Sequence, residues 1–139
     1  MCCDLQFTVG GMIKTKGKTK IFRVSPHPMH YPDEEFIIGF CGNAAEIIDV
    51  ADFYYQPENY KTLPKTKNLS GLVLTKSGKI FQFDNYGKWL AINDQFAAAG
   101  SGCMTALGAL HVGASPKEAV LAACKVDPFT GMGTKVLSF

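Results

Sequence analysis

The sequence has 139 residues, 47% of them apolar, and a formal net charge of only +2 at pH 7. A chain of this length fits one domain, residues 1–139, and can bury roughly 68–70% of its unfolded surface. So small a charge does not indicate a nucleic-acid partner. No apolar run approaches the roughly 20 residues that span a bilayer, and residues 1–4 do not begin a signal peptide. We therefore expect a soluble, cytoplasmic protein without a membrane partner.

The cysteines indicate reduced thiols rather than disulfides. They are five in number, show no C-x-x-C spacing and lie in apolar contexts, which is typical of buried thiols in a reducing compartment. Zinc ligation by Cys2 and Cys3 with His27 and His30 does not fit the ligand spacing of structural zinc sites. We expect no metal and no cofactor.

One basic cluster stands out near the N-terminus. Lys14, Lys16, Lys18 and Lys20 alternate, so an extended backbone places all four on one face. A solvated face is the usual interpretation of this pattern. A nucleic-acid-binding module is the alternative, but no aromatic residues interleave the lysines as stacking platforms.

The first half of the chain predicts short strands and one helix. Residues 5–9 and 21–24 are rich in strand formers, residues 25–35 form a proline-containing loop, and residues 36–41 form a buried strand. A helix follows, with Asn43 as its cap and Glu46 reaching back to that cap. Pro57 closes the helix. Its expected buried face is Ala44, Ile47, Ile48, Ala51 and Tyr55.

The second half predicts a strand meander and two helices. Strands at 69–75 and 79–83 flank a Lys-Ser-Gly turn, and strands at 88–92 and 96–99 follow. A helix covers 103–112, ended by Gly113, with its buried face at Cys103, Ala106, Leu107 and Leu110. Ser115, Pro116 and Glu118 open the next helix as a capping box with proline at its first position. Residues 135–139 form a last strand, so the fold class is α+β, with antiparallel sheets and helices on their outer faces.

This order of elements, with its motifs, resembles the proteasome β-subunit and HslV peptidase family of N-terminal-nucleophile hydrolases. The nearest resemblance is to the short HslV-like proteins of phages and bacteria. The motifs are Lys-Ile-Phe-Arg-Val at 20–24, Gly-Phe-x-Gly-x-Ala at 39–44, Gly-Ser-Gly at 100–102, Ala-Leu-Gly-Ala at 106–109, and Asp-x-x-Thr-Gly at 127–131. The resemblance covers nearly the whole chain and implies a four-layer αββα sandwich.

The resemblance also implies a set of site residues. In this family the nucleophile is the first residue of the mature chain, and its α-amine serves as the base. Lys20 is similar to the lysine that lowers the pKa of both groups, and Asp4 to its aspartate partner. The amine would be oriented by Ser101, Asp127 and Thr130. The Gly42 N–H is similar to the oxyanion donor, and Thr8 to a residue that contacts substrate backbone.

Each of these residues has a structural alternative. Asp4 and Lys20 could form an ordinary ion pair worth 0–1 kcal/mol, and Ser101 could cap the following helix. Asp127 and Thr130 could simply satisfy a turn. Gly42 could be a glycine only because the passage from strand to helix requires one.

The nucleophile is where the sequence departs from the family pattern. The family places a whole strand, beginning with the catalytic threonine, before the strand that holds its aspartate. Three explanations stay open: a natural start upstream of Met1, a shortened non-catalytic relative (a pseudoenzyme), or Cys2 exposed by removal of Met1. Cys2 is the weakest candidate, because it lies only about 7 Å before Asp4 along an extended strand. A missing strand would leave an unpaired edge beside residues 5–9, which we expect to be covered by another chain or to be short and twisted.

Two functions of different classes follow. The first is an N-terminal-nucleophile hydrolase homologue of the threonine-peptidase family, acting on a peptide substrate. The second is a non-catalytic binding or assembly protein that reuses the fold. The resemblance implies a homo-oligomer in either case, since the family packs its helical layers into rings.

Overall fold

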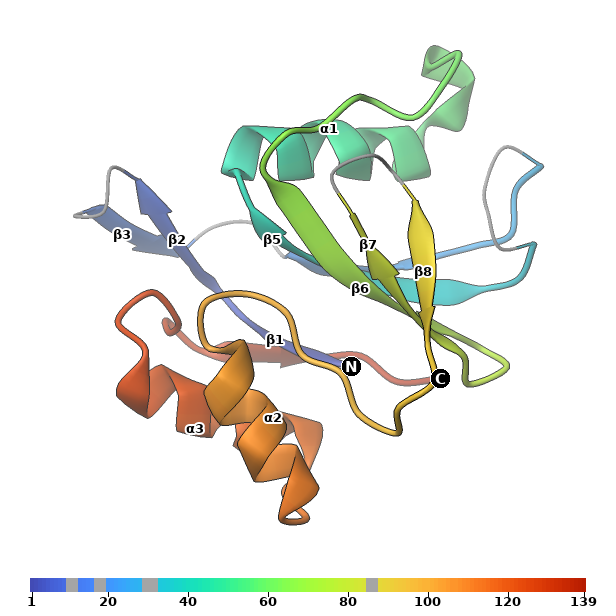
Figure 1. Cartoon of the computed structure of the whole chain (residues 1–139). Coiled ribbons are helices and arrows are strands. Elements are labelled where there is room, and N and C mark those ends of the chain that lie inside the picture. Colours follow the sequence, from blue (N-terminus) through green and yellow to red (C-terminus); the bar gives the residue numbers. More distant parts are fainter. Residues whose placement is uncertain (10–12, 17–19, 29–32, 85–87) are drawn as a thin grey trace.

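A five-stranded antiparallel sheet forms the middle of the molecule in the computed structural model, which describes residues 1–9, 13–16, 20–28, 33–84 and 88–139 (Figure 1). Its strands lie side by side in chain order: β4 (Ile21–Val24), β5 (Phe36–Gly42), β6 (Leu69–Thr75), β7 (Ile80–Phe83) and β8 (Trp89–Ile92). The predicted meander is confirmed. Strands β4 and β6 have the predicted bounds, while β5 ends one residue later and β7 and β8 each begin one residue later than predicted.

Helix α1 (Ala44–Tyr55) covers one face of this sheet (Figure 1). Asn43 caps it as predicted, its side-chain oxygen accepting from the backbone N–H of Ala45 at 2.9 Å. The residues that α1 buries are Ile47, Val50, Phe53 and Tyr54, and they pack on aromatic and aliphatic side chains of β4, β5 and β6. The predicted buried face was wrong at two positions, because Ile48 is 51% and Tyr55 59% exposed. The short 3-10 helix η1 (Pro57–Asn59) follows α1.

Two short strand pairs come from the chain ends. Strand β1 (Cys2–Asp4) pairs antiparallel with β9 (Thr134–Val136), and β2 (Gln6–Val9) pairs with β3 (Ile13–Lys16). The predicted strand over 5–9 is therefore shorter, and a strand at residues 2–4 was missed. The break falls at Leu5, whose N–H donates to the carbonyls of Gly131 and Gly133, both at 3.1 Å, instead of to a strand. The last strand ends at Val136 rather than at Phe139.

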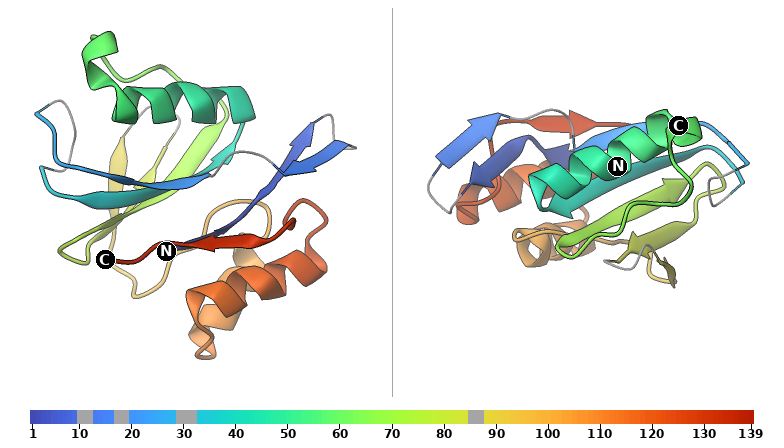
Figure 2. Two further views of the ribbon diagram at one scale, coloured as in Figure 1. Left: turned by 180° about the vertical axis from the view of Figure 1, so that it is seen from behind. Right: turned by 90° about the horizontal axis from the view of Figure 1, so that it is seen from above.

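Helices α2 (Cys103–His111) and α3 (Pro116–Val126) form the outer layer on the other side. They pack on each other through small and aliphatic side chains: Ala106, Leu110, Ala119 and Ala123. Helix α3 also contacts β1 and β9. Figures 1 and 2 show the resulting order of layers: α1, the five-stranded sheet, the β1–β9 pair, and α2 with α3. This is the predicted four-layer αββα sandwich.

The segment at 96–99 is not the strand that the sequence predicted. Phe96 and Ala98 instead pack on the α2–α3 pair, where small side chains allow the backbone to pass close to the helices. The chain therefore passes from β8 to α2 along the helical layer without a strand partner in the described residues. None of the helices in the described ranges is long and apolar enough to cross a membrane.

Candidate functional site

A cleft of about 1280 Å³ lies between the five-stranded sheet and the layer that contains β1, α2 and α3. Residues 1–4, the end of β5, residues 95–102 and the inner sides of both helices line it. Most lining side chains are apolar or small. Among the described lining residues, only Asp4 and Lys20 carry charged side chains. We call this space the interlayer cleft, and both groups of predicted site residues border it.

The first group is the ion pair that the family pattern anticipates. Lys20 Nζ lies 3.1 Å from Asp4 Oδ1 and 3.2 Å from Asp4 Oδ2, and the two side chains are only 12% and 16% exposed. Lys20 precedes β4, while Asp4 ends β1, so the pair joins the two sheets. Asp4 Oδ1 also accepts from the Gln6 N–H at 2.8 Å and the Gly131 N–H at 3.4 Å. The carboxylate is thus held from three directions.

The second group is a cluster of two hydroxyls around one carboxylate. Ser101 Oγ and Thr130 Oγ1 each donate to Asp127 Oδ2 at 2.5 Å. Asp127 is the C-cap of α3, and its Oδ1 accepts from the Phe129 N–H at 3.1 Å, which shapes the following turn. A side chain on Gly102 would lie 3.0 Å from Thr130 Oγ1, so the G-S-G turn fits closely against the cluster.

The structure separates the alternatives for this cluster. Ser101 does not cap α2, whose N-cap is Gly102 and carries no side-chain cap hydrogen bond. Asp127 and Thr130 do form a turn, since the Thr130 N–H donates to the Asp127 carbonyl at 3.2 Å. Asp127 Oδ1 also supports this turn through the Phe129 N–H, while its Oδ2 accepts from the Ser101 and Thr130 hydroxyls, so one carboxylate serves both the turn and the polar cluster at the rim of the cleft.

Gln6 is a site residue that the sequence reasoning did not single out. It is 4% exposed, and its Nε2 donates to the Pro128 carbonyl at 2.9 Å. Gly131 approaches it so closely that an added Cβ would meet Gln6 Oε1 at 2.8 Å. Gln6 therefore clamps the loop after Asp127 to the segment that carries Asp4. The available signal was a glutamine two residues after Asp4 in an otherwise apolar segment.

Gly42 and Thr8, the two predicted substrate contacts, are placed differently. Gly42 ends β5 at the cleft with φ +119°, and an added Cβ would lie 2.0 Å from the Asn68 carbonyl oxygen. Glycine is therefore required there by the backbone. Thr8 lies in β2 opposite Lys14, and its side chain is outside the described residues. The side chains of Lys14, Lys16 and Lys18 are also outside the described residues. Lys20, the fourth lysine of the predicted basic cluster, forms the ion pair with Asp4.

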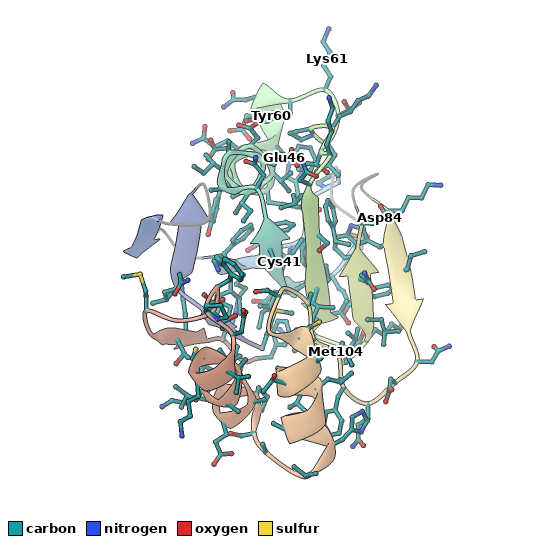
Figure 3. All side chains as sticks on the ribbon, turned by 60° about the vertical axis from the view of Figure 1, so that its left-hand side comes forward. Cys41, Glu46, Tyr60, Lys61, Asp84 and Met104 are labelled. Atoms are coloured by element: carbon teal, nitrogen blue, oxygen red, sulfur yellow. The ribbon has the colours of Figure 1, made fainter. Side chains whose placement is uncertain are left out.

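Four of the five cysteines line the cleft: Cys2, Cys3, Cys41 and Cys103. Burial raises the pKa of the Cys2 and Cys41 thiols, and it raises that of Cys3 to about 11, helped by the neighbouring Asp4 carboxylate. Cys41 Sγ lies 3.1 Å from Ser70 Oγ, and Figure 3 shows Cys41 between β5 and the helical layer. All five cysteines are free thiols. No group of three or more potential metal ligands occurs in the part of the chain that the structure describes.

No protein-family model matches the chain, and neither does any curated protein. Solved structures do match over 96% of its length. They include BPH from Thiobacillus denitrificans (17% identical, TM-score 0.71, 88% of that chain covered) and a eukaryotic HslV from Trypanosoma brucei (19%, 0.65, 88%). Anbu from Hyphomicrobium sp. strain MC1 also matches (14%, 0.65, 73%). The chain thus has the HslV/proteasome-like fold of the N-terminal-nucleophile hydrolases, which confirms the resemblance at the level of the fold.

Proposed function

We propose that this chain is an N-terminal-nucleophile hydrolase homologue that cleaves amide bonds of peptides in the interlayer cleft. The observation that supports this most directly is the arrangement of two polar groups around one cleft. The Asp4–Lys20 pair lies on one side, and the Ser101–Asp127–Thr130 cluster lies at the rim. The Gln6 clamp ties the two groups to the same short segment of chain.

In the proposed mechanism, each group has a separate task. The Lys20 ammonium lowers the pKa of an amine and a hydroxyl placed beside it, because positive charge favours their deprotonated forms. Asp4 fixes Lys20 in position. The Ser101–Asp127–Thr130 cluster orients the α-amine, which takes the proton of the nucleophile and later gives it to the leaving amine. The acyl-enzyme ester then reacts with water and releases the second product.

The oxyanion of the tetrahedral intermediate needs N–H donors at the cleft wall. The Gly42 N–H at the end of β5 is our candidate. Gly42 lines the cleft, which is what makes its N–H available as a candidate donor. Thr8 remains the candidate for a contact to substrate backbone, as the resemblance implies.

The nucleophile itself is the point that an experiment must decide. Residues 1–6 contain no serine or threonine, and the raised pKa of Cys2 keeps its thiol protonated near neutral pH. The native protein should be treated with epoxyketone and β-lactone probes, and its N-terminus and intact mass determined. We expect one label per chain, on a threonine at the mature N-terminus. A native protein that starts at Met1 and takes up no probe would overturn the hydrolase proposal.

Matched lysine variants test the role of Lys20. Lys20→Met should slow labelling by roughly 10²-fold or more, in line with the loss of an electrostatic group in an active site. Lys61→Met removes an exposed lysine far along the chain and should label at the wild-type rate. Equal rates for the two variants would remove Lys20 from the mechanism.

A second function, a non-catalytic binding or assembly protein, is favoured by one observation. Three of the four cleft thiols, those of Cys2, Cys3 and Cys41, have raised pKa values, so none of these three is prepared for attack. This function predicts saturable binding of uncharged peptides with no cleavage products after prolonged incubation. The basic nucleic-acid module is the third alternative. It predicts strongly salt-dependent binding to DNA or RNA, and no binding at low salt would end it.

We further propose that the protein is a homo-oligomer and works in the cytoplasm. Five free thiols fit a reducing compartment. Support for self-association comes from the apolar side chains that the helical layers leave exposed, among them Met104, Val112 and Val126.

A further inference from the structure

One buried polar side chain connects the two polar groups of the interlayer cleft. Apart from tyrosine, the buried polar side chains of the described residues are Gln6 (4% exposed) and Thr75 (1%). Thr75 forms hydrogen bonds within its own hairpin, with Ser77 Oγ at 2.9 Å and the Lys79 N–H at 3.1 Å. Gln6 instead bonds the Pro128 carbonyl, 122 positions away. Burying a carboxamide costs free energy unless it is hydrogen-bonded, so packing alone does not explain a glutamine here.

The carboxamide of Gln6 contacts the loop after α3 on both sides of Thr130. Its Nε2 donates to the Pro128 carbonyl at 2.9 Å, before Thr130. Its Oε1 lies against Gly131, after Thr130, where an added Cβ would approach it to 2.8 Å. The backbone of Gln6 reaches the other polar group, because its N–H donates to Asp4 Oδ1 at 2.8 Å. One residue therefore contacts both groups that border the cleft.

The backbone of the loop after α3 is attached to the same segment. The Leu5 N–H donates to the carbonyls of Gly131 and Gly133, both at 3.1 Å. Between these two glycines, Met132 has a φ of 59°, and in the described ranges it is the only residue other than glycine with a positive φ. Such a backbone conformation persists only where its surroundings fix it. The position of the loop is thus imposed by the segment that carries Asp4.

We propose that Gln6 is a positioning residue that fixes the distance between the Lys20 ammonium and the cluster around Asp127. In the hydrolase mechanism proposed above, on which this inference rests, the reacting amine must lie beside the ammonium and within hydrogen-bond reach of the cluster. The cluster moves with the loop that Gln6 holds, because Thr130 lies in that loop, whereas Asp4 holds Lys20. A misplacement of about 1 Å in such a site costs roughly 100-fold in rate.

Amide hydrogen exchange, followed by mass spectrometry, tests the contact without any activity. Gln6→Met keeps the length of the side chain and removes its donor. We expect the loop after α3 to exchange about 10-fold faster, as the loss of one hydrogen bond allows, while α1 exchanges as in the wild type. Gln82→Met alters an exposed glutamine on β7 and should change neither segment. Equal exchange of the loop in the wild type and Gln6→Met would overturn the proposal.

A variant on the other side of the contact keeps Gln6 and displaces its carboxamide. Gly131 does not have a positive φ, so its backbone accepts alanine, and the added Cβ meets only Gln6 within 4 Å. Gly131→Ala should therefore also speed exchange of the loop. The double variant Q6A/G131A should behave as Gln6→Ala alone, because the oxygen that the Cβ meets is gone. Fully additive effects would mean that Gly131 acts independently of Gln6, and the proposal would be wrong.

Probe labelling measures the consequence for the site. In Gln6→Met and Gly131→Ala we expect the maximal labelling rate to fall about 10- to 100-fold, with the half-saturating probe concentration nearly unchanged, since alignment is lost rather than binding. A change in half-saturation alone would place Gln6 in probe binding and contradict the positioning role. Gln82→Met should label at the wild-type rate.

Gln6→Glu adds a pH signature that a purely structural role does not predict. The glutamate carboxylate has no donor for the Pro128 carbonyl, whereas the protonated acid has one. Burial and the nearby Asp4 carboxylate raise the pKa of such a glutamate, so its labelling rate relative to the wild type should rise from about pH 8 to about pH 5.5. A constant ratio would show that the hydrogen bond to Pro128 plays no part.

The two readouts separate this inference from the proposed hydrolase. Faster exchange of the loop in Gln6→Met, in a protein that takes up no probe, supports the positioning role and refutes the hydrolase. A labelled wild type, with Gln6→Met labelled at the same rate, refutes the positioning role and leaves the hydrolase standing.

Discussion

At the scale of single residues, Gly42 is the clearest case of a backbone requirement. Its φ is +119°, and an added Cβ would lie 2.0 Å from the Asn68 carbonyl oxygen. The backbone conformation and this clash both disfavour any side chain at position 42. We expect Gly42→Ala to lower the free energy of unfolding by more than about 3 kcal/mol, since backbone strain and a backbone clash add. Urea unfolding followed by circular dichroism measures this loss.

Gly78 provides the matched control. It also has a positive φ, +87°, but its added Cβ would meet nothing within 4 Å. Gly78→Ala should therefore cost only the left-handed backbone penalty, about 1–2 kcal/mol. If both substitutions cost the same, the contact with Asn68 contributes nothing and strain alone explains Gly42.

The same scale shows what sequence motifs can and cannot locate. The motifs indicated Asp4, Lys20, Ser101, Asp127 and Thr130, and the structure brings these residues together in two groups at one cleft. Gln6 was not singled out, because its importance comes from the Pro128 carbonyl, more than a hundred residues away. A hydrogen bond of that kind depends on how a loop returns to the strand, which no local pattern encodes.

At the scale of elements, the start of α3 is stabilised by a complete capping box. Ser115 Oγ accepts from the Glu118 N–H at 3.3 Å, and Glu118 Oε2 accepts from the Ser115 N–H at 2.8 Å. Ser115→Ala should cost about 1 kcal/mol. The hydrogen bonds from Ser115 lower the pKa of Glu118 below its ordinary 4.5, because they favour the carboxylate.

The sign of the pH effect follows from that lowered pKa. The contribution of Glu118 is present above pH 4.5 and is lost as the pH falls through the folded-state pKa. Thermal melting between pH 7 and pH 3 should therefore show a larger acid-induced fall for the wild type than for Glu118→Gln. Parallel melting curves for the two proteins would show that the carboxylate plays no part in the cap.

Helix α1 shows why the type of an element is easier to predict than its orientation. Asn43, Pro57 and the apolar spacing predicted the helix and its bounds. The exact buried face was harder to choose, because both Ile47 and Ile48 fit a helical stripe beside the polar side of Glu46, Asp49 and Asp52. The sheet decides the orientation: Tyr54 packs edge-on against Phe36, with 5.7 Å between the ring centroids, while Tyr55 lies at the edge of the contact, 59% exposed with its ring against Phe22.

At the scale of the whole molecule, the order of elements was enough to predict four layers, but the space between the layers was not predictable. The width of the interlayer cleft depends on small residues at 97–100 and on the broken strand at Leu5, both of which are tertiary details. One consequence of this space is that thiols from two layers face it and are poorly solvated. Cys3 is in β1 and Cys41 in β5, and burial raises the pKa of each.

These raised pKa values predict that the fold loses stability in alkali. The unfolded thiol gives up its proton near pH 9.0, whereas folded Cys3 keeps its proton until about pH 11. The contribution is therefore complete below pH 9 and is lost as the pH rises through this window. For Cys3 the loss approaches about 2–3 kcal/mol, at 1.36 kcal/mol for each unit of pKa.

Melting temperatures measured in a non-thiol reductant should fall from pH 8 to pH 10.5, and fall less in Cys3→Ala. That difference in slope isolates the thiol, because lysines and tyrosines titrate alike in both proteins. Equal slopes would mean that Cys3 is hydrated in the folded state, and that water reaches β1 through the cleft.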